Sequence, residues 1–475
     1  MIRRLARVRR MTGLVAAALA ALSAVGTAVA LSATADGPPR PDFRTGPGAA
    51  APASARLSTP GTVSSSAPDR PTTSTSGVAD PAAGALASAL AAALGGHTGC
   101  AAAMAGGRQV AVVGPGVAVA PASTQKLLVA AAALSVLGPQ HRFLTRVVSS
   151  GPVVAGVAPR LWLVGSGDPM LVTAGYQGLV MTHSHEPGPP VTPFGWLVNA
   201  LRAAGVTSVP GGVSGDDTLL SPQRFLPTWK PVYVSEGDVG ALSALSLDEG
   251  WDAWLPRWVP TADPPTHAAA ALSWQLALAG VRVGPVGPDG PPPPGAVTVA
   301  SVSSAPLSSV VAYMLATSDN HVAELLTRAV GLAVAGQGTT AAGTQAVLDV
   351  VSGLGVDTSG AVMVDGSGLS TQNRATCAEL LGVYEAGGRP DLAALRTGLP
   401  VAGRDGTLYQ LWRHTPLAGR VVAKTGWING AAAVVGTVRG HRPVDFAFAV
   451  NGQFGFGPAY DMETAALDAL AAYAG

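Results

Sequence analysis

The chain has 475 residues, enough for two or three domains, and only 12% of them are charged, with a formal net charge of +1. This balance excludes the basic surface of a nucleic-acid-binding protein and provides no acidic tract for a basic partner. The two cysteines, Cys100 and Cys377, are too few for a disulfide framework and lack metal-ligand spacing. They could form one bridge in an exported protein or remain two buried thiols.

The N-terminal segment has the pattern of an export signal. Five arginines lie within the first ten residues, and residues 11–35 carry no charge. Residues 1–35 are therefore predicted to be either a signal peptide, cleaved after Ala28-Val29-Ala30, or a membrane anchor. Both alternatives place the rest of the chain outside the cytoplasm. Residues 36–80 are rich in Pro, Ser, Thr, Ala and Gly, which predicts a disordered linker.

Ordered structure is predicted to begin after this linker. A helix is expected at 85–94, and Ala/Val-rich runs at 100–105 and 109–119 predict a β-hairpin. The apolar positions of 123–137 then recur with helical spacing. Ser123 is therefore expected at the N-terminus of a helix.

The C-terminal part has the pattern of an antiparallel meander. Strands are predicted at 420–426, 431–438 and 444–450, followed by a helix at 459–473. Helices that flank such a meander predict an α+β fold with three α/β/α layers. The range 146–299 is richer in Pro, Gly and Trp and contains strand-like runs, so it is predicted to be a β-containing insertion.

Three short motifs occur in a fixed order along the chain. They are Ser123-Thr124-Gln125-Lys126, Ser318-Asp319-Asn320 and Lys424-Thr425-Gly426. Residues i and i+3 of a helix share a face, so the Lys126 amine can reach the Ser123 hydroxyl. Lys126 can act as a base only if burial or a second cation lowers its pKa, and Lys424 is the obvious second cation. Only three positions of the chain are lysine, and arginine could not replace this base.

The remaining motif residues suit an acyl-transfer site for a peptide with a free carboxylate. The hydroxyl of Ser318 can relay a proton, and the carboxamide of Asn320 can hold a substrate amide. Lys424 and Thr425 can bind a terminal carboxylate, and Gly426 lets a substrate backbone lie close to the strand. Taken alone, the first motif is more often a solvated helix face, the second a helix cap or turn, and the third a strand end. Their order and their predicted elements favour catalysis.

Together the motifs resemble those of the class C low-molecular-mass penicillin-binding proteins, the D-alanyl-D-alanine carboxypeptidase/endopeptidase family. The matching segments are Pro121–Leu127, Gly165–Pro169, Asp365–Ser370 and Gly403–Leu408. The resemblance runs from about residue 81 to the C-terminus. It implies a transpeptidase/β-lactamase-like domain made of 81–145 and 300–475, with 146–299 inserted between the first two motifs.

The resemblance also implies an activity and its site residues. Ser123 would be acylated by peptidoglycan stem peptides or by β-lactams, without a cofactor or a metal ion. Lys126 would assist deprotonation, and Ser318 and Asn320 would act in proton transfer and substrate binding. Trp427 follows the third motif, where a small or hydroxyl residue is more usual. Its backbone N–H would still serve an oxyanion hole and place Trp427 among the substrate-binding residues.

Two other interpretations fit the sequence less well. A class A β-lactamase needs a deacylating Glu in a Glu-x-x-x-Asn segment between the first two motifs, and that segment is absent from the sequence. A wall-associated scaffold protein with a disused site would not need intact motifs. The sequence therefore predicts an exported enzyme that contacts a membrane only through its N-terminal segment.

Overall fold

The computed structural model describes residues 81–183 and 188–475. The predicted export segment, 1–35, and the predicted linker, 36–80, lie outside the described residues. In the part of the chain that is described, no helix is long and apolar enough to span a bilayer.

A five-stranded antiparallel sheet brings the first and last ordered parts of the chain together. Its strand order is β15-β16-β17-β1-β2, and every neighbouring pair is antiparallel. The strands are β1 (Thr98–Ala105), β2 (Arg108–Val113), β15 (Val421–Ile428), β16 (Ala431–Val438) and β17 (Val444–Asn451). The predicted hairpin is shorter than expected, because β2 ends at Val113 and a separate short strand, β3 (Ala118–Val119), follows.

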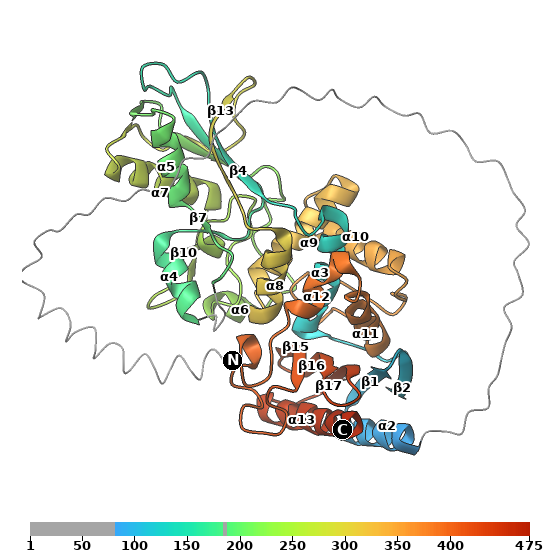
Figure 1. Ribbon diagram of the computed structural model, residues 1–475. Helices are drawn as coiled ribbons and strands as arrows, with labels where there is room; N and C mark the ends of the chain where they lie inside the picture. The colour runs from blue at the N-terminus through green and yellow to red at the C-terminus, as the bar shows by residue number, and fades with distance from the viewer. Residues whose placement is uncertain (1–80, 184–187) are drawn as a thin grey trace, which may run out of the picture. The chain divides into compact units, whose positions relative to one another are not determined.

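Helices cover both faces of this sheet, which gives it three layers. On one face α2 (Pro81–Ala93) and α13 (Phe456–Ala474) lie side by side, and α11 (Cys377–Ala386) packs on the other (Figure 1). Nearly every residue of β16 and β17 is buried, as expected for strands covered on both faces. The predicted α/β/α architecture is confirmed.

The main hydrophobic core surrounds one almost completely buried helix, α3 (Lys126–Leu137). Residues 127–134 are all 1% exposed or less, since α3 is apolar on every side. The surrounding helices are α8 (Leu307–Thr317), α9 (Asn320–Ala335), α10 (Thr340–Gly353), α11 and α12 (Ala394–Thr397). This packing holds the first motif, at the start of α3, in a rigid part of the fold.

The inserted domain has a sheet and a hydrophobic core of its own. The strand order is β13-β4-β5-β9. The strands are β4 (Leu144–Ser149), β5 (Leu161–Val164), β9 (Val213–Asp216) and β13 (Val297–Ser303), and the helices packed on them are α5 (Gly195–Ala203) and α7 (Pro264–Leu278). The chain leaves the main core through β4 and returns through β13, which pair with each other antiparallel. The exact boundaries at 146 and 299 stay a prediction.

Shorter elements complete the described chain. In the inserted domain these are β6 (Leu171–Val172), α4 (Ala174–His183), β7 (Thr192–Pro193), β8 (Ser208–Val209), α6 (Pro231–Ser235), η2 (Asp248–Gly250), β10 (Trp251–Ala253), β11 (Val259–Pro260) and β12 (Arg282–Val283). In the main domain they are η1 (Ala122–Gln125), β14 (Ala375–Thr376), η3 (Pro390–Leu392) and η4 (Gly406–Leu408).

The two cysteines form a disulfide. The bond joins Cys100 of β1 to Cys377 at the start of α11, across a sequence separation of 277 residues. Of the two alternatives from the sequence, the bridge is therefore the one that the fold adopts. It ties the sheet to the helical layer on its α11 face.

Candidate active site

Ser123 lies in a strained turn that the surrounding backbone holds in place. It belongs to the 3₁₀ turn η1, directly before α3, rather than to the α-helix itself. The preceding residue, Ala122, has φ +48°, a left-handed conformation that is costly for a residue with a Cβ. Gly368 packs directly against the Ala122 carbonyl. A Cβ on Gly426 would lie 2.6 Å from the Pro121 carbonyl oxygen. The turn that carries Ser123, called the nucleophile turn below after its predicted role, is thus packed between two glycines.

The amine of Lys126 has three polar neighbours at hydrogen-bond distance. Its Nζ donates to Asn320 Oδ1 at 2.7 Å and to the Ser367 carbonyl at 2.5 Å, and it lies 3.0 Å from Ser123 Oγ. A neutral amine has two N–H groups and one lone pair. The charged amine donates to all three neighbours, and in the neutral form, with both N–H groups on Asn320 and Ser367, the lone pair would face the Ser123 hydroxyl. The arrangement suits proton abstraction from Ser123.

Burial makes this amine easier to deprotonate. Lys126 is fully buried, and desolvation lowers its pKa from 10.5 to about 8, although the nearby carboxylates, Asp365 foremost, oppose the shift. Lys424 is also fully buried. Its pKa is lowered well below the usual value by burial and by the charge of Lys126. The charge of Lys126 therefore acts on Lys424, whereas the pKa of Lys126 is lowered by burial rather than by the second cation that the sequence predicted.

The second motif lies at the junction of two helices. Ser318 ends α8 in the left-handed region, with φ +62°, and Asp319 caps α9 by accepting from Val322 N at 2.9 Å. Asn320 is the first residue of α9, and its carboxamide is bonded at both ends: Oδ1 to Lys126 and Nδ2 to the Asp238 carbonyl. Among the described residues, no hydrogen bond joins Ser318 to Ser123 or to either motif lysine.

The third motif lies on the edge strand β15. Lys424 Nζ donates to the Thr425 carbonyl at 2.6 Å, and Thr425 is half-buried. Gly426 packs against the nucleophile turn, where its Cβ would be 2.8 Å from Ser123 N. The ring of Trp427 packs edge-on against Phe456 at the start of α13, with 5.8 Å between the ring centroids. The Trp427 side chain therefore contributes to packing on that side of the strand.

Two buried carboxylates, to which the sequence assigned no role in the site, support the lysine. Glu324 lies one helical turn after Asn320 on α9, and its Oε1 accepts from Gly366 N and Ser367 N at 2.9 and 2.7 Å. Burial, with Asp365 nearby, raises the pKa of Glu324. Glu324 and Arg328 are charged residues among the buried apolar positions of α9, and this is the sequence signal that could have revealed Glu324.

Asp365 accepts several hydrogen bonds that hold the loop 365–370 in place. Its carboxylate is completely buried. It accepts bonds of 2.7 to 3.3 Å from Gly368 N, Ser370 N, Asn373 Nδ2, Gln125 Nε2 and Trp229 Nε1. These bonds fix the loop whose Ser367 carbonyl faces Lys126. The Asp365–Ser370 match therefore has a structural role that its glycines alone did not indicate.

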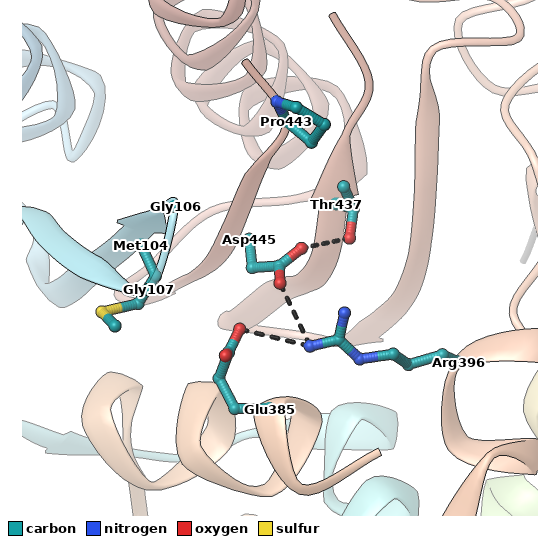
Figure 2. A pocket seen from close by; sticks show the side chains of 8 residues that line it. All are labelled: Met104, Gly106, Gly107, Glu385, Arg396, Thr437, Pro443 and Asp445. Carbon is teal, nitrogen blue, oxygen red and sulfur yellow. Dashed lines mark hydrogen bonds and ion pairs between the residues drawn. The ribbon is translucent and has the colours of Figure 1, made fainter. Parts of the chain in front are cut away.

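A separate cavity lies beside the turn between β1 and β2. It has a volume of about 350 Å³ and is lined by Glu385, Arg396, Thr437 and Asp445, among others (Figure 2). Arg396 Nη2 donates to Glu385 at 3.3 Å and to Asp445 at 3.1 Å. None of the predicted site residues lines this cavity.

Comparison with solved structures defines the class of the fold. The chain superimposes on penicillin binding protein 4 (dacB) from Haemophilus influenzae with a TM-score of 0.68, covering 81% of this chain and 99% of that one. The two sequences are 22% identical, so the likeness is one of fold. The fold is thus that of the penicillin-binding proteins, with the additional inserted domain.

Sequence comparisons identify the family. The model of the D-Ala-D-Ala carboxypeptidase 3 (S13) family matches residues 87–253 and 251–473. A carboxypeptidase of Mycobacterium tuberculosis is 34% identical over 347 residues, covering 70% of this chain and 71% of its own length. The D-alanyl-D-alanine carboxypeptidase of an Actinomadura species is 31% identical over 436 residues, with coverages of 75% and 77%. The chain belongs to the S13 family of D-Ala-D-Ala carboxypeptidases, which confirms the predicted resemblance and enzyme class.

Proposed function

We propose that the chain hydrolyses the terminal D-Ala-D-Ala bond of peptidoglycan stem peptides, or a peptide cross-link, through an ester formed on Ser123. The observation that carries this proposal is the orientation of the Lys126 amine. Its Nζ has acceptors in Asn320 Oδ1 and the Ser367 carbonyl and lies 3.0 Å from Ser123 Oγ, so the lone pair of the neutral amine would face that hydroxyl. With a pKa near 8, a useful fraction of this amine is neutral at ordinary pH.

In the acylation step, Ser123 Oγ attacks the carbonyl carbon of the penultimate D-Ala while its proton moves to Lys126 Nζ. The C–N bond then breaks, and the departing amine of the terminal D-Ala takes up a proton, which we assign to a relay through the Ser318 hydroxyl. A water molecule later hydrolyses the ester and restores the Ser123 hydroxyl. The balance is one water consumed and one D-Ala released.

The other motif residues have supporting roles in this proposal. The backbone N–H groups of Ser123 and Trp427 form the oxyanion hole, because β15 packs directly on the nucleophile turn at Gly426. Lys424 and Thr425 bind the terminal carboxylate of the substrate. Asn320 acts first on Lys126, since both ends of its carboxamide are already bonded within the protein. For Asn320 to contact a substrate amide, as predicted, one of these two hydrogen bonds would have to be replaced by a bond to the substrate.

Incubation with a labelled penicillin, followed by peptide mapping, tests the acyl-serine. We expect label on the peptide that contains Ser123, and release of D-Ala from a defined stem peptide by the same preparation. Ser123→Ala should abolish both. Ser88→Ala, which removes an exposed hydroxyl on α2, is the matched control and should change neither. Label on another peptide would overturn the assignment.

We further propose that the catalytic part of the chain works outside the cytoplasm. The family's substrate is peptidoglycan, and the Cys100–Cys377 disulfide suits an oxidising compartment. The N-terminal segment then acts as a cleaved signal peptide or as an anchor. Sequencing the N-terminus of the mature protein in each cell fraction distinguishes the two. A start after Ala30 indicates cleavage, and an intact N-terminus in the membrane fraction indicates an anchor.

A further inference from the structure

The inserted domain supports both acceptors of the Lys126 amine by two routes, Asn320 directly and the Ser367 carbonyl through Asp365. The first route runs through Asn320, whose Nδ2 donates to the Asp238 carbonyl at 2.9 Å. Asp238 belongs to the inserted domain. Because Nδ2 must point at this carbonyl, Oδ1 of the same carboxamide must point at Lys126. The insertion therefore decides which end of Asn320 faces the lysine.

The second route runs through the loop 365–370. The indole Nε1 of Trp229, another residue of the inserted domain, donates to Asp365 Oδ2 at 2.9 Å. Asp365 in turn holds the loop that carries the Ser367 carbonyl onto Lys126. Trp229 is only 7% exposed and shares a hydrophobic cluster with Leu325 of α9 and Leu369 of the loop. The contact is thus packed as well as hydrogen-bonded.

We infer that the inserted domain positions the catalytic lysine, with Trp229 as the positioning residue that fixes the Ser367 carbonyl on the Lys126 amine. This inference rests on the proposed function, in which Lys126 deprotonates Ser123. It gives the insertion a role in the chemical step of acylation, in addition to any contact with the wall polymer.

The physical reason lies in the rotational freedom of an amine. If the Ser367 carbonyl moves away, one N–H of Lys126 loses its acceptor, and the amine can turn its lone pair away from Ser123. Asp365 is completely buried, so losing the indole donor leaves part of its carboxylate unsatisfied and favours a rearranged loop. Small displacements of a reacting group reduce catalytic rates strongly. The proposed function assigns neither the Trp229 indole nor the Asp365 carboxylate a contact with the substrate, so the half-saturating concentration should not depend on them.

Trp229→Phe tests the inference, because phenylalanine keeps an aromatic ring but lacks the N–H. The matched control is Trp412→Phe. Trp412 is 1% exposed, and its Nε1 donates to Thr464 Oγ1 at 2.9 Å, away from Lys126. Both variants lose one buried indole hydrogen bond. We expect the maximal acylation rate with labelled penicillin to fall about tenfold in Trp229→Phe, with an unchanged half-saturating concentration. The rate of Trp412→Phe should stay within about twofold of the parent at a similar loss of melting temperature.

Equal acylation rates in the two variants would overturn the inference, as would a change in the half-saturating concentration alone. If Trp229→Phe does not fold, replacing Trp229 with 3-benzothienylalanine keeps the ring shape and substitutes sulfur for the N–H. The same fall in rate is expected, and a parental rate would overturn the role of the N–H. Failure of the proposed function gives a different result, since the parent protein itself would then carry no label on Ser123.

Discussion

Two regions of the main domain hold positively charged side chains in different surroundings. Near β15, Lys126 and Lys424 are completely buried, and they donate hydrogen bonds to neutral oxygens of Ser123, Asn320, Ser367 and Thr425. Beside the β1–β2 turn, Arg396 is partly exposed and bonded to the carboxylates Glu385 and Asp445 (Figure 2). A carboxylate partner holds a cation in its charged form, whereas burial among neutral acceptors lowers its pKa. The first region suits proton transfer, and the second suits a lasting ion pair.

Backbone conformation shows the same contrast. Around Ser123, positive φ occurs at Gly368 and also at Ala122 and Ser318, both of which carry a Cβ. At the β1–β2 turn, positive φ falls on Gly106 and Gly107, where it is not costly. Strain of this kind persists only where the surrounding structure enforces it. The comparison predicts that changes near β15 alter acylation, and that changes near the β1–β2 turn alter mainly stability.

The largest effect on acylation is expected for Lys126→Arg. Arginine keeps the positive charge but does not release its proton, so the base is lost while the charge remains. We expect the acylation rate to fall by about 10²–10⁴-fold, measured with labelled penicillin at saturation. Circular dichroism should show a folded protein. Acylation at the parental rate would remove Lys126 from the mechanism.

Gly426→Ala should have the next largest effect. The new Cβ would lie 2.6 Å from the Pro121 carbonyl oxygen and 2.8 Å from Ser123 N, so the nucleophile turn must move. A displacement of this size is expected to slow acylation by about 10²-fold. Gly419→Ala is a control in which a Cβ meets no neighbour within 4 Å, although its φ of +73° adds some backbone strain. An unchanged rate in Gly426→Ala would mean that the turn tolerates the shift.

The pH dependence of acylation should follow the lowered pKa of Lys126. Only the neutral amine accepts a proton, and the pKa is about 8, so the active fraction grows as pH rises through that value. Between pH 6 and pH 8 the acylation rate should increase by about 50-fold and then level off. Stopped-flow measurement with a chromogenic β-lactam would follow this rise. A flat profile over the same range would exclude a base with this pKa.

Removing the disulfide should affect stability far more than acylation. Replacing both Cys100 and Cys377 with alanine is expected to lower the free energy of unfolding by about 2–4 kcal/mol, measured with denaturant. Lys126 is held by other contacts, so the acylation rate of the folded variant should stay within about twofold of the parent. A large loss of acylation would show that the sheet and α11 must be tied together for the site to form.

The smallest effect is expected for Arg396→Ala. The guanidinium and its two carboxylate partners are 20% to 37% exposed, so the ion pairs are worth less than about 1 kcal/mol after screening by solvent. The acylation rate should not change measurably. A clear fall in that rate would mean that the residues around the cavity of Figure 2 are energetically coupled to the active site.

Much of the site was predictable because its motifs are local. The spacing of Ser123 and Lys126 within one turn indicated their contact, and the 3.0 Å separation of Oγ and Nζ agrees with it. The strands of the meander were predictable from their apolar runs. The 3₁₀ turn at Ser123 was not, because its backbone is set by Gly368 and Gly426, which are distant in the sequence.

By itself, the sequence determined the order of the motifs, the chemistry that a lysine can offer and arginine cannot, and the layers of the main fold. These depend on residue type and on spacing within single elements. Only the tertiary structure decided that the Ser367 carbonyl meets a lysine 241 residues away, that both ends of Asn320 are engaged, and that the cysteines are joined. Such contacts depend on how elements pack against one another, and no local pattern in the chain encodes that packing.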